Sequence, residues 1–253
     1  MKKKKICSLM YHDAYVDNKS ESGLDFESAN SYKITNIAFE SQIKAISEVL
    51  DKKGISRDSV RFTFDDGGVS FYTIYAPILE KYGFKGYFFI ATEYLNKEGF
   101  LSEKQVVELY QRGHYIGSHS HSHRQMMTSL PREEQKKDWE RSIDILSNLI
   151  KKQVHIASLP NGFCSKEMLG VLDELGISEV YTSNPTENIN TSANLIIYGR
   201  YGIKDGMSTE DVIRIIFNPF TKSFIKIKKT ILKGAKYLLG HQYIKIREFL
   251  YRH

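Results

Sequence analysis

Apolar residues recur along this chain with two alternating periods, one typical of helices and the other typical of short buried strands. In the first clear helix, the apolar positions of 39–50 repeat every three or four residues, and Gly54 ends the run. A second helix is expected to begin at the capping box Ser102-x-x-Gln105 and to end at Gly113. Strand-like runs fall between such helices.

This alternation predicts an α/β fold in which helices connect parallel strands that close, fully or partly, into a barrel. A chain of 253 residues is long enough for one such domain with a substantial core. The expected strands lie near 5–11, 59–65, 86–91, 115–118, 154–158, 178–182 and 196–199, and the expected helices near 37–53, 70–82, 102–112, 132–151, 165–175 and 208–216.

An acidic turn follows one of the predicted strands. The short apolar run 60–64 ends at Asp65 and Asp66, after which two glycines permit a positive φ. Adjacent carboxylates repel unless a cation neutralises one of them or the pair shares a proton. One acid is therefore a candidate metal ligand and its neighbour a candidate general base. An acidic turn that caps the next helix is the alternative interpretation.

A histidine-rich segment lies farther along, with imidazoles at His114, His119, His121 and His123. Residues i and i+4 share a face of a helical segment, so His119 and His123 are the better pair of ligands and His121 is the poorer partner. Imidazole nitrogens and a carboxylate oxygen together form a donor set for a divalent metal. A histidine-rich surface loop that binds no metal is the alternative interpretation.

These two segments carry a family resemblance. The motif Thr-Phe-Asp-Asp-Gly at 63–67, followed by His-Ser-x-x-His at 119–123, resembles the first two motifs of the polysaccharide deacetylase family, the NodB-homology carbohydrate esterases. The resemblance covers roughly residues 5–215. It implies the family fold, a distorted (β/α)7 barrel, in which active sites assemble beyond the strand ends.

The resemblance also implies roles for individual side chains. Carried over by position, Asp66, His119 and His123 bind one divalent metal ion, for which zinc is the first expectation and cobalt or nickel the others. Asp65 is then the general base.

The N-terminal apolar run ends in the segment Tyr-His-Asp at 11–13. It resembles the corresponding segment of the poly-N-acetylglucosamine deacetylases, a subgroup whose motif order is circularly permuted. The resemblance implies that His12 is the catalytic acid, a role that suits imidazole because its ordinary pKa lies near neutral pH. A structural histidine at a strand end is the alternative interpretation.

The chain departs from the family at its third motif, which usually reads Arg-x-Pro-x-Gly. Ser158 stands where that arginine would orient the base, and a Pro-Asn-Gly turn follows it. The backbone N–H of Asn161 or Gly162 could donate to a developing oxyanion, or the segment is simply a strand-to-helix turn. The late tryptophan and Leu-x-His motifs are absent, and Trp139 is expected in the core of a helix, which favours the permuted subgroup.

Basic residues are concentrated at the C-terminal end. From Thr221 onward the chain has nine Lys or Arg and one acid, Glu248, so this part carries 9 − 1 = +8 and the preceding residues carry 6 − 8 = −2. We therefore divide the chain into a catalytic barrel, 1–216, and a basic amphipathic helical tail, 217–253. Such a helix could lie on an anionic membrane or dock on the barrel with its lysines in solvent, and nucleic-acid binding is not expected. The lysines in question are Lys222, Lys226, Lys229, Lys233 and Lys236.

The apolar run that follows Lys5 is far shorter than the core of a secretory signal, and no stretch is long enough to cross a bilayer. We therefore expect a cytoplasmic protein. If its basic tail binds lipid, the contact is expected at the inner face of the membrane. Cys7 and Cys164 are too few to indicate a disulfide scaffold.

The expected function is a metal-dependent hydrolase that removes an N-acetyl or other N-acyl group from an amino sugar in a glycan or glycan precursor. A same-fold amidase that acts on a small non-sugar amide or formamide is one alternative. A non-catalytic glycan-binding relic is the other, although such a relic would more often have lost Asp65 or a histidine.

Overall fold

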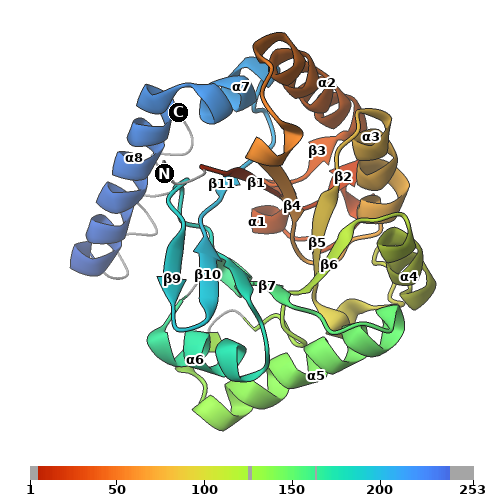
Figure 1. Ribbon diagram of the computed structural model, residues 1–253, viewed down its shortest axis with the longest axis vertical. Helices are drawn as coiled ribbons and strands as arrows, with labels where there is room; N and C mark the ends of the chain where they lie inside the picture. Colours follow the sequence, from red (N-terminus) through yellow and green to blue (C-terminus); the bar gives the residue numbers. More distant parts are fainter. Residues whose placement is uncertain (1–4, 125–126, 163, 240–253) are drawn as a thin grey trace.

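The computed structural model describes residues 5–124, 127–162 and 164–239, and for 232–239 it describes the backbone alone. A curled sheet lies at the centre with its helices around the outside (Figure 1). The strands follow the order β11-β1-β4-β5-β6-β7-β8-β10-β9, all parallel except the antiparallel pair β9 and β10. Their bounds are β1 Cys7–Tyr11, β4 Val60–Phe64, β5 Gly86–Ile90, β6 Tyr115–Ser118, β7 Ile156–Ser158, β8 Glu179–Tyr181, β9 Asn190–Ser192, β10 Leu195–Tyr198 and β11 Tyr201–Gly202.

Local sequence signals mark the ends of several helices. Thr35 accepts a hydrogen bond from the Ala38 amide at the start of α2, and Gly54 ends that helix with a φ of 61°. The capping box of Ser102 and Gln105 opens α4 as expected. The bounds are α1 Glu27–Asn30, α2 Asn36–Lys53, α3 Ala76–Lys81, α4 Glu103–Gln111, α5 Arg132–Ile150, α6 Lys166–Glu174, α7 Thr209–Phe217 and α8 Pro219–Leu239.

Aromatic side chains fill the space between the sheet and its outer helices. Tyr11 stacks on Phe64 with 5.6 Å between ring centroids, and Phe71 stacks on Phe88 at 5.2 Å. All four side chains are fully buried. Large rings bury much apolar area at low conformational cost, so they hold the strand ends, and the residues that follow them, in fixed positions.

Segment 13–35 is ordered and is anchored by one buried carboxyl group. Asp13 accepts hydrogen bonds from the hydroxyls of Ser22, at 2.6 Å, and Ser70, at 2.9 Å. Its carboxyl group lies so close to Gly23 and Gly68 that a Cβ on either glycine would lie 1.8 Å from an Asp13 oxygen. This contact ties the N-terminal segment to the turn that follows β4. The small strands Ala14–Tyr15 (β2) and Ile34–Thr35 (β3) pair within the same segment.

The structure agrees with the α/β barrel prediction. Each expected strand and helix is present within about two residues of its predicted bounds, except that the helix expected over 70–82 is divided into a π-helical segment, Phe71–Tyr75, and α3, which begins at Ala76. The chain also has β2, β3, β9, β11 and α1, which were not predicted from the sequence. Trp139 is buried in α5 as expected, and Cys7 and Cys164 form no disulfide.

The start of α8 at Pro219 lies near the predicted boundary at residue 217. Two of the five lysines proposed for membrane contact are engaged by the protein itself: Lys222 pairs with Glu187 at 2.6 Å, and Lys229 donates to the Ser183 carbonyl at 2.5 Å. Membrane contact through the five lysines stays a prediction. The side chains of Lys233 and Lys236 lie outside the described residues.

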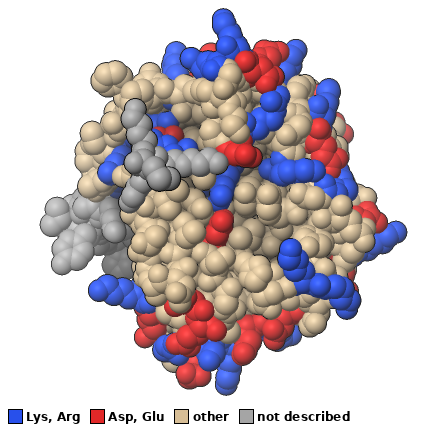
Figure 2. All heavy atoms as spheres, in the orientation of Figure 1, with Lys and Arg blue, Asp and Glu red and all other residues tan. Residues whose placement is uncertain are grey.

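Charged side chains are mixed on the face of the molecule shown in Figure 2. Lys and Arg lie among Asp and Glu around its margin, and the described residues of this face form no broad region of one sign. None of the described helices combines the length and the apolar character that a bilayer span requires.

Candidate metal centre and active site

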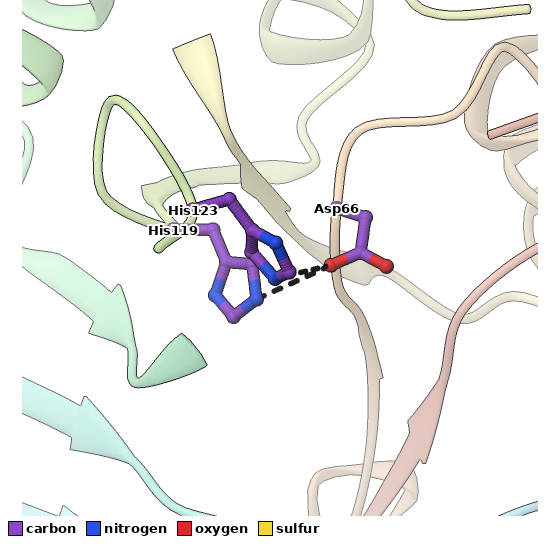
Figure 3. Close-up of side chains that lie close together, drawn as sticks. All are labelled: Asp66, His119 and His123. Atoms are coloured by element: carbon purple, nitrogen blue, oxygen red, sulfur yellow. Dashed lines mark ion pairs between the residues drawn. The ribbon is translucent and has the colours of Figure 1, made fainter. Parts of the chain in front are cut away.

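Three side chains from two separate turns converge on one point at the carboxyl ends of the strands. Asp66 follows β4, whereas His119 and His123 follow β6, and the three side chains point toward one another (Figure 3). Asp66 Oδ1 lies 3.3 Å from His119 Nε2 and 3.2 Å from His123 Nε2. The three ligand atoms all lie within 4.8 Å of one another. The predicted ligand set is therefore brought together.

Two of these residues adopt backbone conformations that L-residues seldom use. Asp66 has a φ of 87° and His123 a φ of 49°. Each such conformation costs about 1 kcal/mol or more and persists only when neighbouring contacts impose it. The Asp66 carbonyl accepts a hydrogen bond from the Ala91 amide, and the His123 amide donates to Ser120 Oγ at 3.1 Å. The turns are thus shaped to aim their side chains at the common point.

The ring orientation of His119 suits metal binding. Its Nδ1 lies 2.8 Å from the Ser158 carbonyl oxygen. Because a carbonyl accepts but cannot donate, Nδ1 carries the proton and Nε2 has the lone pair directed toward Asp66. Metal-binding histidines commonly have such a partner on the other nitrogen. Two imidazoles and one carboxylate therefore fit a divalent cation at this point.

Asp138, from α5, holds the loop that carries both histidines. Its carboxylate accepts hydrogen bonds from the backbone amides of His121, at 2.9 Å, and Ser122, at 3.2 Å. Thr92 contributes a second contact, with Oγ1 2.9 Å from His121 Nδ1. His121 is thereby engaged outside the ligand set, as its spacing indicated. His114 is also remote from the set and pairs with Glu80.

Asp65, the predicted base, is held by an arginine that the sequence did not reveal. Arg200, between β10 and β11, donates two hydrogen bonds of 2.7 Å to the two carboxylate oxygens of Asp65. Both side chains are almost completely buried. Arg200 is itself fixed by a hydrogen bond from Nε to the Thr182 carbonyl at 3.1 Å. The arginine that the third motif lacks thus has a counterpart in the connection between β10 and β11.

Ser158 occupies the position of the missing motif arginine and links the two halves of the site. Its hydroxyl donates to Asp65 Oδ2 at 3.1 Å and accepts from Arg200 Nη2 at 2.8 Å. Its carbonyl oxygen is the acceptor for His119. A side chain as long as arginine at this fully buried position would compete with Arg200 for the same space.

The electrostatic surroundings keep both acids ionised. Burial alone would raise the pKa of Asp65, but the Arg200 guanidinium more than offsets this effect and holds that pKa below its usual value. Burial likewise opposes ionisation of Asp66, whose pKa is nevertheless held well below the usual value by the imidazoles of His119 and His123 that contact it. A carboxylate at each position is therefore available near neutral pH.

His12 lies in the wall of the same cavity, with its ring 4.6 Å from that of Tyr32 between centroids. Its Nδ1 is buried and has no hydrogen-bond partner among the described residues. Burial lowers the pKa of His12, while the nearby carboxylates of Asp66 and Asp65 oppose that shift. Its role as the acid remains a prediction.

The two candidate oxyanion donors differ in availability. Both Asn161 and Gly162 line the cavity, with φ values of 55° and 69°. The Gly162 amide donates to the Leu159 carbonyl at 3.0 Å, so in this conformation it is not available to an oxyanion, which corrects half of the prediction. The Asn161 amide is the remaining candidate.

The ligand set and Asp65 open into one cavity of about 370 Å³. Segment 13–35 contributes much of its wall and so covers part of the site, and Ser183 also lines it. A carboxylate base beside a divalent-cation site suits metal-assisted attack of water on a carbonyl. The other wall residues include Met10, Leu24, Phe26, Ser28, Ala29, Tyr32 and Leu159.

Comparison with known proteins relates this site to one family. The profile of the family described as polysaccharide deacetylase matches residues 52–180. A protein of Bacillus subtilis strain 168, YxkH, provisionally assigned as a polysaccharide deacetylase, is 27% identical over 196 residues, which span 72% of this chain and 65% of that protein. A poly-β-1,6-N-acetyl-D-glucosamine N-deacetylase of Staphylococcus aureus strain MRSA252 is 26% identical over 206 residues, 70% of this chain and 71% of that protein. The chain thus spans slightly less than two thirds of the first relative.

Solved structures show the same fold. The deacetylase PplD of Streptococcus pyogenes, solved in complex with acetate, superposes with a TM-score of 0.67 and 24% identity over 84% of this chain and 98% of that one. IcaB of Ammonifex degensii superposes with a TM-score of 0.66 and 20% identity over 84% of this chain and 96% of that one. The predicted distorted barrel is therefore confirmed.

Proposed function

Because this chain belongs to the polysaccharide deacetylase family, we propose that it is a metal-dependent hydrolase that removes an N-acetyl, or other N-acyl, group from an amino sugar in a glycan or glycan precursor. The observation that carries the proposal is the position of Asp65. It is a buried carboxylate, held by Arg200, in the same cavity as the cluster of Asp66, His119 and His123.

The reaction would divide among residues of this chain. A bound divalent cation supplies Lewis-acid polarisation of the amide carbonyl and lowers the pKa of water. Asp65 accepts a proton as the water oxygen bonds to the carbonyl carbon, and Arg200 keeps the carboxylate oriented. The Asn161 amide donates to the oxyanion. His12 then gives a proton to the nitrogen as the C–N bond breaks, which releases the free amine and a carboxylate.

The donor set favours zinc as the resident metal. Two neutral imidazoles and one carboxylate leave a coordination position open for substrate, the arrangement typical of catalytic zinc sites. Cobalt and nickel accept the same donors. The cytoplasmic location expected from the sequence remains a prediction.

Acetate release from defined substrates tests the proposed function. Purified protein, with its metal content measured, would be assayed on N-acetylglucosamine oligomers, lipid-linked and nucleotide-linked amino sugars, and small non-sugar amides. We expect release from at least one N-acetylated sugar and a loss of about 100-fold or more in Asp65→Asn and in His12→Ala. Asp58→Asn is the matched control, because Asp58 is an exposed acid at the opposite end of β4 from Asp65.

Each possible result bears on a named part of the proposal. Hydrolysis of small amides but of no sugar substrate would reject the amino-sugar proposal in favour of the amidase alternative. Full activity in Asp65→Asn or in His12→Ala would remove the role assigned to that residue. No hydrolysis of any substrate by metal-loaded protein would favour the non-catalytic alternative.

A further inference from the structure

Helix α8 presents a row of large apolar side chains to solvent. Phe220, Phe224, Ile227 and Ile231 are 83%, 67%, 57% and 64% exposed. Their spacing of three or four residues places them along one side of the helix. We name these four residues the apolar stripe. The helix that bears it runs along the edge of the molecule (Figure 1).

The opposite side of α8 holds the helix on the barrel. Lys222 pairs with Glu187, Lys229 donates to the Ser183 carbonyl, and Ile225 packs against the core between them. These three residues are separated by three and four positions, so they share the face turned about 180° from the apolar stripe. Lysines thus contact the protein while the apolar residues point outward, the reverse of a helix docked through its apolar face.

We propose that the apolar stripe docks this protein on an anionic lipid surface. A helix that lies in a bilayer interface places an apolar face among the acyl chains and basic residues among the headgroups. Lys226 is exposed beside the stripe, and the chain from Thr221 onward carries nine Lys or Arg against one acid. That charge matches anionic headgroups and would repel an identical tail on a second copy.

Helix α8 contacts the rim of the cavity with the side opposite to the apolar stripe. The Ser183 carbonyl and hydroxyl both accept from Lys229, and Ser183 lines the cavity that holds Asp65. Lys222 contacts Glu187 farther along the same rim segment. Docking through α8 would therefore place the rim on the far side of the helix from the lipid, about 10 Å from the membrane surface. Resting on the proposed function, this placement favours an amino-sugar glycan carried by a lipid over one free in solution.

Vesicle sedimentation with the full chain tests the docking. We expect wild-type protein to sediment with phosphatidylglycerol-containing vesicles, much less with phosphatidylcholine alone, and less as salt increases. The double variant Phe224→Asp with Ile231→Asp should lose at least about tenfold in vesicle affinity. Ile37→Asp is the matched control, because Ile37 is 73% exposed on a different helix.

Three results would overturn the docking proposal. They are no sedimentation of wild-type protein with anionic vesicles, unchanged sedimentation of the double variant, and a wild-type dimer in solution that the double variant abolishes. Thermal melting checks that each variant is folded. Acetate release from a soluble oligomer is measured in parallel and should be unchanged in the double variant. If no protein releases acetate, the proposed function fails while the vesicle result still decides the docking.

Discussion

Arg200 and Asp65 lie 135 positions apart in the chain and are joined by two parallel hydrogen bonds of 2.7 Å in an almost fully buried pair. A bidentate pair of this kind fixes the carboxylate plane as well as its charge. The base is therefore oriented from β10, while the family's third motif, at the end of β7, retains only Ser158 for this purpose.

Replacement of Arg200 should impair catalysis through Asp65. In Arg200→Met the carboxylate loses its cation, so the pKa of Asp65 rises and the acid limb of the activity profile moves to higher pH. We expect kcat/KM to fall about 100-fold at neutral pH, and Arg200→Lys to recover part of the loss because it restores charge but not the bidentate geometry.

Arg112 provides the matched control for this variant. It also makes two hydrogen bonds of 2.9 Å to a single carboxylate, that of Glu80, and it lies away from the cavity. Arg112→Met should leave the acid limb in place. An unshifted acid limb in folded Arg200→Met would show that the arginine is only structural.

Zinc should stabilise the wild-type protein through the ligand set. At a free concentration about 100 times Kd, binding to the folded state adds about 2.7 kcal/mol, or roughly 5 to 10 °C in Tm for a chain of this size. His123→Ala should lose this increase, whereas His121→Ala should keep it. Differential scanning fluorimetry with and without zinc makes the comparison, and equal zinc responses in the two variants would count against the assigned ligands.

Asp138 should strengthen metal binding although it is not a ligand. Without its carboxylate, the amides of His121 and Ser122 lose their acceptor, and the loop that aims both histidines loosens. We expect Asp138→Ala to weaken zinc binding by about 10-fold to 100-fold in calorimetric titration. Asp144→Ala removes an exposed acid from the same helix and should bind zinc like the wild type. If the two variants have the same zinc affinity, Asp138 does not position the loop.

The buried anchor at Asp13 should make stability depend on pH. Burial raises the pKa of Asp13 to about 6, with the hydroxyls of Ser22 and Ser70 opposing the shift. Because the folded pKa exceeds the unfolded one, the folded state binds the proton more tightly. The contribution of Asp13 is therefore favourable at about pH 4 and is lost as pH rises to about 6, a change on the order of 3 kcal/mol.

Asp13→Asn removes this titration. Urea unfolding of wild type and variant between pH 4 and 7 should therefore show wild-type stability falling relative to the variant by roughly that amount. The exposed Asp58→Asn serves as the control and should follow the wild-type pH profile. A constant difference between wild type and Asp13→Asn would mean that the carboxyl group keeps one protonation state throughout.

The sequence predicted what periodicity and short motifs encode. The long helices and the main strands have clear periods and caps, and the ligand set lies in two compact motifs. Arg200 gave no such signal, because it stands in a short connection whose contact with Asp65 exists only after β10 joins the sheet. The bonding of the Gly162 amide and the outward direction of the apolar stripe also depend on tertiary contacts rather than on local pattern.

The close fit of Asp13 against Gly23 and Gly68 distinguishes positions that cannot change from positions that can. The backbone of the covering segment is locked to the turn behind the base, so neither glycine tolerates a side chain. In the same segment, Leu24 and Phe26 line the cavity, and neither contacts Asp13 or the two glycines in this way. Divergence toward new sugars within this architecture would therefore proceed through those wall positions, with the hydrolytic apparatus inherited intact.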